Sequence, residues 1–279
     1  MYIVVDIGGT NTRVAASKDG RGFSKIEKFK TPKKFEHGLA QIVAGVKRVQ
    51  GAQKIKGLAV AVPGSIDSKN KALLNLPNLP GWSNKPITKV LTRHLNCKMR
   101  LINDADAAGL GEAAQGAGRG YTRVAYFTIS TGIGGARLVH GKLDPKFQNW
   151  EPGHFVLVPH GRKCGCGRRG CFESYASGTG FYKTYGIHPE NCKNQTIWNK
   201  YAQTLGRGIV NALRHDPPNI IVIGGGVSQA GERLFKPLRA YLKNNFPTQK
   251  PPPIKKAALG DLAGLYGCLA LFKGRKNFS

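Results

Sequence analysis

The chain has 279 residues, 41% of them hydrophobic, and contains 37 glycines. That length allows two domains of ordinary size or one large one, and the composition excludes a disordered chain. Its 43 Lys and Arg residues against 15 Asp and Glu give a formal net charge of +28, spread along the whole sequence. Such a surface predicts nonspecific attraction of nucleic acid, polyphosphate or anionic lipid. The alternative is that the charge is unrelated to the reaction.

The first residues, MYIVVDIGGT, predict a buried strand and no signal peptide, because they contain neither a basic segment nor a cleavage site. No apolar run approaches the ~20 residues that span a bilayer. These features predict a soluble, cytoplasmic protein.

The first part of the chain predicts one α/β unit. Three strands near the N-terminus predict an antiparallel meander, with a glycine turn after the first strand. Apolar residues at helical spacing, a continuous buried strand and a proline-rich loop follow. The expected elements are strands within 1–10, 12–17 and 22–31, a helix over 35–49, a strand over 58–64, a loop over 75–82, a helix over 87–94, a strand over 99–104 and a helix over 104–114.

After a glycine-rich stretch at 116–120 the pattern repeats. A strand over 122–130, the glycine turn TGIGG and the strand ARLVHGKL repeat the N-terminal strand–turn–strand order, which suggests two related halves. Because strands alternate with helices in both halves, the chain is expected to be an α/β protein with a mostly buried sheet in each half. The remaining expected elements are a helix over 195–213, a strand within 219–228, a helix over 230–244, a strand over 254–259 and an apolar helix over 261–272.

The stretch over 151–173, EPGHFVLVPHGRKCGCGRRGCFE, places one histidine and three cysteines in one short loop: His154, Cys164, Cys166 and Cys171. Tetrahedral zinc takes imidazole nitrogen and thiolate sulfur, and Cys₃His is a standard structural set. We therefore predict a structural zinc site. The alternatives are a disulfide with two exposed thiols, or a redox C-x-C pair.

The residues between these ligands support the zinc prediction. Glycines 165, 167 and 170 would let a short backbone turn three sulfurs toward one centre. Basic residues at 162, 163, 168 and 169 would lower the thiol pKa values and favour the thiolates that a metal needs. A glutamate stands at each end, Glu151 and Glu173, and a metal-bound loop would fix both carboxylates in space.

Three glycine turns follow predicted strands: Gly8-Gly9 with Thr10, the segment 131–135, and the segment 224–226. Consecutive backbone N–H groups in such turns suit a phosphate chain, and Asp6, before the first turn, could hold Mg²⁺ through water. One glycine turn commonly just closes a hairpin, but three predict nucleotide binding. Their spacing fits neither a P-loop nor a Rossmann dinucleotide site.

Asp104 follows a predicted strand and begins a predicted helix. In phosphoryl transfer to an alcohol, an aspartate accepts the hydroxyl proton while the protein positions the groups. An Asp at a helix start is equally an N-cap, worth about 1 kcal/mol. Both interpretations remain open from the spacing, and Asp106 is interpreted as a solvated helix residue.

Six segments in order, DIGGTNTRVA, AVPGSID, LINDADAAGLGEA, ISTGIGGA, EPGH and CGCGRRGCFE, resemble the ROK family of bacterial sugar kinases. The resemblance covers nearly the whole chain. It implies a two-domain actin-like, hexokinase-like (ribonuclease H-like) α/β fold with an interdomain cleft. We expect a small N-terminal domain over 1–115, with the helix at about 261–279 packing back on it, and a larger domain over 116–260 that carries the zinc loop.

The resemblance also implies roles for individual residues. Asp104 would be the base that takes the proton from the acceptor hydroxyl. The sugar would be bound by Gly64, Asn78, Asn103, Asp104, Glu151, His154 and Glu173, with His154 also a zinc ligand. The nucleotide would be bound by Asp6, Gly8, Gly9, Thr10, Thr12, Thr131, Gly132 and Gly225. Where the family usually has P-G-P, this chain has Pro63-Gly64-Ser65, which loosens one wall of the sugar pocket.

The expected activity is that of an ATP-dependent kinase acting on the 6-hydroxyl of an aldohexose, with glucose as the first substrate. N-acetylglucosamine or N-acetylmannosamine are alternative acceptors, and polyphosphate is an alternative donor. The resemblance implies structural Zn²⁺, Mg²⁺ with ATP, and a homodimer. The non-enzyme alternatives are a sugar-responsive regulator and a nonspecific polyanion binder. Family repressors carry a winged helix-turn-helix before the kinase-like part, whereas here the first strand starts at residue 2, which favours the enzyme.

Overall fold

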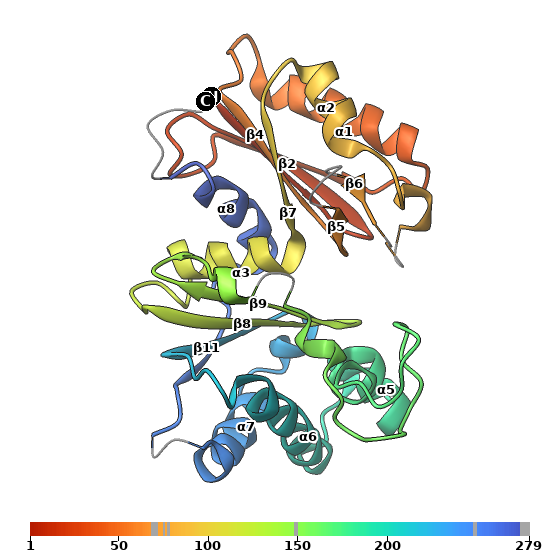
Figure 1. The fold of residues 1–279 in the computed structure, drawn as a ribbon, viewed down its shortest axis with the longest axis vertical. Helices are drawn as coiled ribbons and strands as arrows, with labels where there is room; N and C mark the ends of the chain where they lie inside the picture. The colour runs from red at the N-terminus through yellow and green to blue at the C-terminus, as the bar shows by residue number, and fades with distance from the viewer. Residues whose placement is uncertain (68–71, 75, 77–78, 148–149, 248–249, 274–279) are drawn as a thin grey trace. The chain divides into compact units, whose positions relative to one another are not determined.

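The computed structural model describes the chain except residues 68–71, 75, 77–78, 148–149, 248–249 and 274–279 (Figure 1). The chain divides into two compact units. The first unit comprises Met1–Ala114 and Asp261–Ser279, and the second comprises Gln115–Gly260. Each unit is built around one five-stranded sheet.

The first sheet has the strand order β3-β2-β1-β4-β7. Its first three strands form the predicted antiparallel meander, whereas β4 and β7 run parallel to β1. Strand β4 is buried along its whole length, as its continuous apolar sequence predicts for a central strand covered on both faces. The strands are β1 (Tyr2–Ile7), β2 (Asn11–Ser17), β3 (Lys25–Lys30), β4 (Gly57–Val62) and β7 (Met99–Asn103), with a short hairpin of β5 (Ile66–Asp67) and β6 (Ala72–Leu73).

Helices cover both faces of this sheet. Figure 1 shows α1 (Phe35–Gln50) and α2 (Ile87–Leu95) on one side and α8 (Ala263–Ala270) on the other. Alternate residues Ile3, Val5 and Ile7 of β1 join the core under α1 and α2. Helix α8 contacts β1, β4 and β2, so the end of the chain completes the first unit.

Helix α3 (Asp104–Gln115) packs against α8 through glycine. A Cβ on Gly111 would lie 2.2 Å from the carbonyl oxygen of Ala263, and one on Gly267 would lie 1.7 Å from that of Ala107. Neither position has room for a side chain, so the two helix backbones are in direct contact.

The second sheet has the order β10-β9-β8-β11-β12, which matches the first sheet strand for strand. Again three strands pair antiparallel and two follow in parallel. The shared order agrees with the two related halves that the sequence suggested. The strands are β8 (Arg123–Ile129), β9 (Ile133–Val139), β10 (Lys142–Leu143), β11 (Ile220–Gly224) and β12 (Ile254–Lys256).

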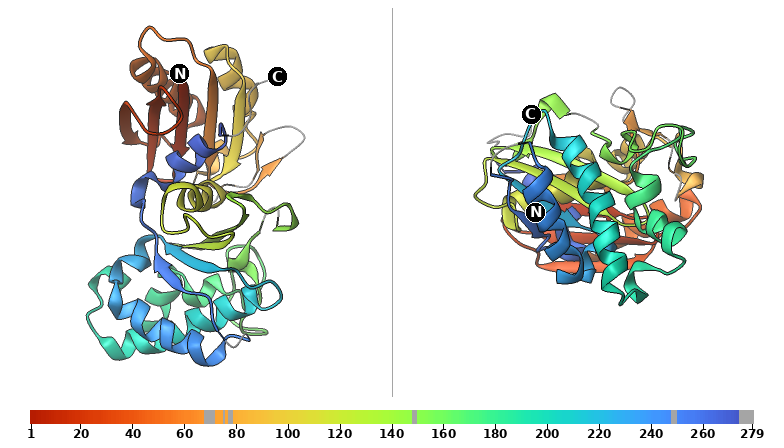
Figure 2. Two further views of the ribbon diagram at one scale, coloured as in Figure 1. Left: turned by 90° about the vertical axis from the view of Figure 1, so that its left-hand side faces the viewer. Right: turned by 90° about the horizontal axis from the view of Figure 1, so that it is seen from below.

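Helices α6 (Gln195–Leu213) and α7 (Glu232–Asn245) cover one face of the second sheet, as the view from below in Figure 2 shows. Their apolar residues form one core with β8 and β11 that includes Phe127, Trp198, Tyr201 and Ile221. The connecting segments contain η2 (Pro145–Phe147), η3 (Pro152–His154), α4 (Glu173–Ala176), α5 (Gly178–Tyr185) and η4 (Pro189–Asn191); η1 (Pro80–Trp82) belongs to the first unit.

Several element boundaries differ from the sequence prediction; the strand expected over 254–259, for example, already ends at Lys256. The glycine turn after β8 is shorter than expected, because β9 already begins at Ile133, which pairs with Ile129. The helix expected from residue 230 begins at Glu232, after η5 (Gly226–Ala230), because Gly231 has a φ of 59° and interrupts the helical backbone. The terminal helix begins at Ala263, after η6 (Gly260–Leu262).

Within the described part of the chain, no helix combines the length and the apolar character needed to cross a membrane.

Candidate functional site

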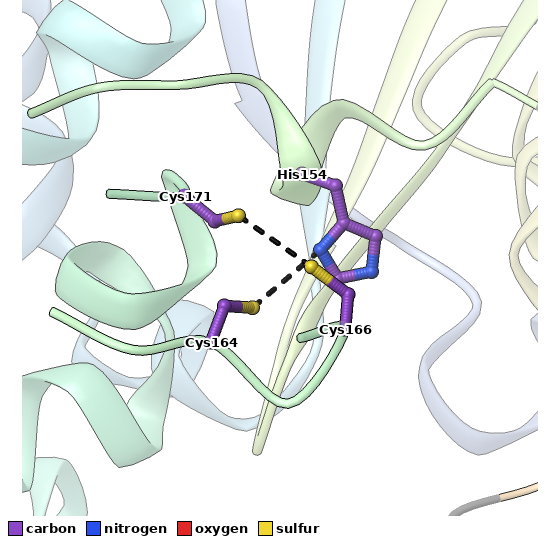
Figure 3. Close-up of side chains that lie close together, drawn as sticks. All are labelled: His154, Cys164, Cys166 and Cys171. Atoms are coloured by element: carbon purple, nitrogen blue, oxygen red, sulfur yellow. Dashed lines mark hydrogen bonds between the residues drawn. The ribbon is translucent and has the colours of Figure 1, made fainter. Parts of the chain in front are cut away.

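Four side chains in the second unit converge on one point (Figure 3). They are His154, at the end of η3, and Cys164, Cys166 and Cys171 from the following loop, and their candidate ligand atoms all lie within 4.8 Å of one another. The Sγ of Cys164 lies 3.7 Å from Nδ1 of His154, and the Sγ atoms of Cys166 and Cys171 are also 3.7 Å apart.

These distances fit a tetrahedral metal site. With zinc–sulfur bonds near 2.3 Å, neighbouring ligand atoms of a tetrahedron lie about 3.8 Å apart. A disulfide would need its sulfurs at about 2.05 Å, and all six cysteines are free. Three thiols and one imidazole form a donor set typical of structural zinc, so these residues fit the ion.

Two of the three glycines between the cysteines are required by the loop backbone. Gly167 and Gly170 have φ angles of 89° and 79°, in the left-handed region, and a Cβ on Gly170 would lie 1.9 Å from the carbonyl oxygen of Val158. Gly165 has no such constraint, because its Cβ position has no neighbour within 4 Å among the described residues. Glycine is therefore required by the local backbone at positions 167 and 170, and the described residues impose no steric requirement for it at Gly165.

The basic residues around the loop do not act equally on the thiols. Burial works to raise the pKa of Cys166, but the hydrogen bonds of Arg168, Cys164 and Cys171 together outweigh it and lower the pKa to about 7. Burial raises the pKa of Cys171, and the neighbouring thiols Cys166 and Cys164 raise it further. The expected lowering thus holds for Cys166 and is wrong for Cys171. A bound cation would be needed to deprotonate Cys171 near neutral pH.

The two glutamates at the ends of the loop lie near the cluster. Glu173 begins α4, and its Oε1 lies 3.9 Å from the Sγ of Cys164. Partial burial raises the pKa of the Glu151 carboxyl, the charge of Glu173 raises it further, and His154 opposes the rise. A cavity of about 300 Å³ opens at this point, lined by Lys146, Phe147, Trp150, Glu151, His154, Phe155 and Arg168.

Glu173 also contacts the glycine turn after β8. Its Oε2 accepts a hydrogen bond of 2.8 Å from the backbone N–H of Ile133. A Cβ on Gly132 would lie 2.4 Å from the same oxygen, so glycine is required there unless the carboxylate moves. Two predicted regions, the cysteine loop and the turn with Thr131 and Gly132, therefore meet at one carboxylate. Thr131 is exposed.

The third glycine turn follows β11. Gly225 has a φ of 82°, and a Cβ there would lie 2.4 Å from the carbonyl oxygen of Ile129, at the end of β8. The hydroxyl of Ser228 donates to the carbonyl of Gly225 at 2.7 Å. Gly225 is thus held beside the end of β8, where the other glycine turn of this unit begins.

In the first unit, the turn after β1 is fixed by a threonine that the sequence analysis did not single out. Thr31, just after β3, donates its hydroxyl to the carbonyl of Gly8 at 2.7 Å and its N–H to the carbonyl of Thr10 at 2.9 Å. The Thr12 hydroxyl lies 2.9 Å from that of Thr31 and is fully buried. Thr12 therefore stabilises the turn through its contact with Thr31. Thr10 is exposed, and Gly9 is partly buried. The register of the predicted meander, which places residue 31 opposite residue 10, could have identified Thr31.

Asp6 lies on β1 beside the first turn of α8. A Cβ on Gly264 would lie 2.8 Å from the Asp6 carboxyl carbon. Burial raises the pKa of Asp6 to about 6; Arg13 opposes this rise, and the charge of Asp261 adds to it. Arg13 itself is paired with Asp261.

Asp104, Asn103 and Gly64 gather where β4 and β7 end. The Asn103 amide donates to the Gly64 carbonyl at 2.9 Å, and its Oδ1 accepts from the N–H groups of Ala105 at 2.8 Å and Asp106 at 3.1 Å. Asn103 thus caps α3, the role considered for Asp104, which is the first helical residue and also accepts from Ala105. Asp106 is partly buried. Asn78, predicted to bind sugar, lies outside the described residues.

Two α/β units with sheets of the same strand order, each carrying glycine turns after its central strands, define the hexokinase-like (actin-like) class of folds. Within that class the chain belongs to the ROK family, whose sequence model matches residues 2–275. Both the fold class and the family predicted from the sequence are confirmed.

Individual relatives extend this result. The chain is 32% identical to a glucokinase of Thermotoga maritima, with 98% of this chain and 97% of the relative covered. It is 30% identical to an N-acetyl-D-glucosamine kinase of Haemophilus influenzae, with 98% and 99% covered. The crystal structure of a ROK family glucokinase from Streptomyces griseus in complex with glucose and AMPPNP matches with a TM-score of 0.81 at 27% identity, covering 97% of this chain and 98% of that one.

Proposed function

We propose that the protein is an ATP-dependent hexose kinase that transfers the γ-phosphoryl group to the 6-hydroxyl of glucose. One observation carries the proposal: the carboxylate of Glu173 contacts both the Cys₃His cluster, through Cys164, and the glycine turn suited to phosphate, through Ile133. The curated relatives named above are sugar kinases and match along almost the whole chain, which supports the same class of reaction.

Each unit contributes its own groups to the proposed reaction. Asp104, in the first unit, accepts the proton of the acceptor hydroxyl as the oxygen attacks the γ-phosphorus and ADP leaves. Asn103 holds the Gly64 carbonyl and the start of α3, which positions Asp104 and one wall of the sugar site. In the second unit, Glu151, Glu173 and Nε2 of His154 bind sugar hydroxyls, since Nδ1 is the ring nitrogen nearest the cysteines.

The phosphates would be bound by the backbone of the glycine turns, Gly8 to Thr10 in the first unit and Thr131 to Gly132 in the second. Gly225 would lie against the adenosine. Magnesium bound with ATP would neutralise phosphate charge, and Asp6 would orient it through water. Zinc would be held by the four residues of the cluster and would supply a structural cross-link between η3 and the loop that ends at Cys171.

An N-acetylhexosamine is the second candidate acceptor. The cavity beside Glu151 and His154 has aromatic walls from Phe147, Trp150 and Phe155, which suit the methyl group of an acetamide. The relative from Haemophilus influenzae carries that substrate in its name. Polyphosphate is the alternative donor, because a net charge of +28 attracts polyanions.

The deciding experiment is an activity screen with purified protein. Glucose, mannose, N-acetylglucosamine and N-acetylmannosamine are each offered with ATP or polyphosphate, at low and high salt. The proposal expects the highest kcat/KM with glucose and ATP. A higher kcat/KM with an acetamido sugar would show that the acceptor is an N-acetylhexosamine and not glucose. Faster turnover with polyphosphate than with ATP would show that polyphosphate is the donor.

Asp104→Asn separates the kinase from a sugar-binding regulator or a polyanion binder. Turnover should fall by several orders of magnitude while sugar affinity, measured by calorimetry, stays within about threefold, because only the proton acceptor is lost. Asp106→Asn is the matched control and should keep most of its activity. Full turnover by Asp104→Asn would rule out this assignment of the base.

A further inference from the structure

The segment around the cysteine cluster contacts the glycine turn 130–133 at three points. Oε2 of Glu173 accepts from the N–H of Ile133 at 2.8 Å. The N–H of Gly178 donates to the carbonyl of Ser130 at 2.6 Å. Gly153, next to His154, packs so closely that a Cβ there would lie 2.3 Å from the carbonyl oxygen of Ile133. The turn is thus held from both ends of the cysteine loop.

Every one of these contacts starts close to a candidate metal ligand. Gly153 precedes His154, Glu173 lies two residues after Cys171, and Gly178 follows the short helix α4 that Glu173 begins. The loop has little regular structure of its own to hold this arrangement. Its backbone contacts include two isolated β-bridges, between Val156 and Cys171 and between Lys163 and Arg169. A metal bound to the four ligands would fix the two chain segments from which the contacts arise.

We propose that Glu173 is a positioning residue for the turn 130–133, and that metal occupancy of the Cys₃His cluster sets nucleotide affinity through it. This inference rests on the proposed function, in which that turn binds donor phosphates. The carboxylate accepts a hydrogen bond from the N–H of Ile133 and occupies the space beside Gly132. It therefore stabilises one backbone conformation of the turn. The shape of the turn decides where the remaining N–H groups point, and phosphate binding depends on their direction.

Two substitutions at one position separate this role from sugar binding. Glu173→Gln keeps an oxygen that can accept from Ile133, whereas Glu173→Ala removes the acceptor. Nucleotide affinity is measured with MgAMPPNP and no sugar, by calorimetry on the zinc-loaded protein. We expect about tenfold weaker binding for Glu173→Ala, the effect of losing a hydrogen bond to a charged group, and less than threefold weakening for Glu173→Gln. Glu190→Ala, an exposed position in the same unit, controls for the change in charge.

A second measurement needs no substitution. Zinc is removed with a chelator and restored, and hydrogen exchange of the segment 128–135 is followed together with MgAMPPNP affinity. We expect faster exchange of the Ile133 amide and at least tenfold weaker nucleotide binding without zinc, both reversed when zinc is restored. Peptides from β12, the edge strand, and from α7, which packs on it, should keep their exchange rates if the unit stays folded.

The outcomes distinguish the two proposals. If the wild-type protein with zinc binds no MgAMPPNP and phosphorylates no sugar, the proposed function fails. If it binds nucleotide and turns over, but Glu173→Ala and zinc removal leave nucleotide affinity unchanged and weaken only sugar binding, the positioning role is overturned. Equal loss in Glu173→Gln and Glu173→Ala would also overturn it, because the negative charge and not the hydrogen bond would then be responsible.

Discussion

Asn103 donates from its amide nitrogen to the carbonyl oxygen of Gly64 at 2.9 Å, and this hydrogen bond joins the end of β7 to the turn after β4. Gly64 has a φ of 74°, so the turn already adopts a backbone that few residues other than glycine accept. The same amide caps α3, at whose first position Asp104 stands. One side chain thus fixes the glycine turn and the start of the helix.

Replacing Asn103 is expected to affect both features. Asn103→Ala should lower the free energy of unfolding by about 1–3 kcal/mol, because a cap and a partly buried hydrogen bond are lost, and should reduce kcat through the displaced Asp104. Asn103→Asp keeps the cap but loses the donor to Gly64, so it should restore part of the stability. Urea unfolding and steady-state kinetics measure the two effects. Equal stability of Asn103→Ala and wild type would contradict the prediction.

Asp6 should make stability depend on pH. Its folded pKa of about 6 lies above the ordinary value of 3.8, so the folded state disfavours the charged form. The wild type therefore loses stability as the pH rises from about 4 through about 6, whereas Asp6→Asn has no such loss. Urea unfolding should find the two proteins similar near pH 4 and the variant more stable by up to roughly 3 kcal/mol above pH 7. A stability difference that does not change with pH would refute the raised pKa.

Loss of the metal should destabilise the second unit. Zinc analysis of the purified protein should find about one ion per chain, and Cys166→Ser should lower both zinc content and melting temperature. Cys97→Ser is the matched control, because Cys97 belongs to the first unit and is not a member of the cluster. A protein purified without zinc that melts like the zinc-loaded one would show that the cluster has no structural role for metal.

Arg137 on β9 is a buried charge whose removal should be costly. Its Nη2 donates to the carbonyl oxygen of Asp216 at 2.6 Å and to its carboxylate at 2.7 Å, and the guanidinium lies 4.6 Å from the ring centroid of Phe147. Burial and, to a smaller extent, the charge of Arg123 lower its pKa to about 10, against the opposing charge of Asp144. Among the described residues, Nη1 has no hydrogen-bond partner.

Arg137→Ala should therefore lower the free energy of unfolding by on the order of 3 kcal/mol. The substitution leaves a cavity where the side chain was buried, and it removes the buried partner of the Asp216 carboxylate. Arg123 pairs with the same carboxylate, but its side chain is 38% exposed against 3% for Arg137, so Arg123→Ala should cost less than about 1 kcal/mol. Chemical denaturation of both variants measures the difference. Similar losses in the two would show that burial of Arg137 is not the cause.

Local sequence patterns were sufficient for much of the fold and for the cluster. The four candidate metal ligands belong to one loop, so their spacing alone brought them together, and the continuous apolar run of β4 predicted a covered central strand. Helix α6 begins and ends at the residues expected from the sequence, with Asn194 accepting hydrogen bonds at its start.

Contacts between distant segments were not predictable in the same way. The hydrogen bond between Ile133 and Glu173 spans 40 positions, and neither residue signals the other. Asp6 acquires its raised pKa because the end of the chain returns to β1, which no local pattern shows. Tertiary packing also decided the start of β9, since Ile133 pairs with Ile129 and shortens the turn.

The return of α8 to the first sheet has a consequence for synthesis on the ribosome. The second unit is continuous in sequence, so all of its residues have been made by the time Gly260 is added. The first unit, although begun earlier, keeps one sheet face without its helix until α8 emerges from the exit tunnel. The unit whose translation begins first is therefore completed after the other, and its apolar strands remain exposed to aggregation until the residues that follow the second unit have been made.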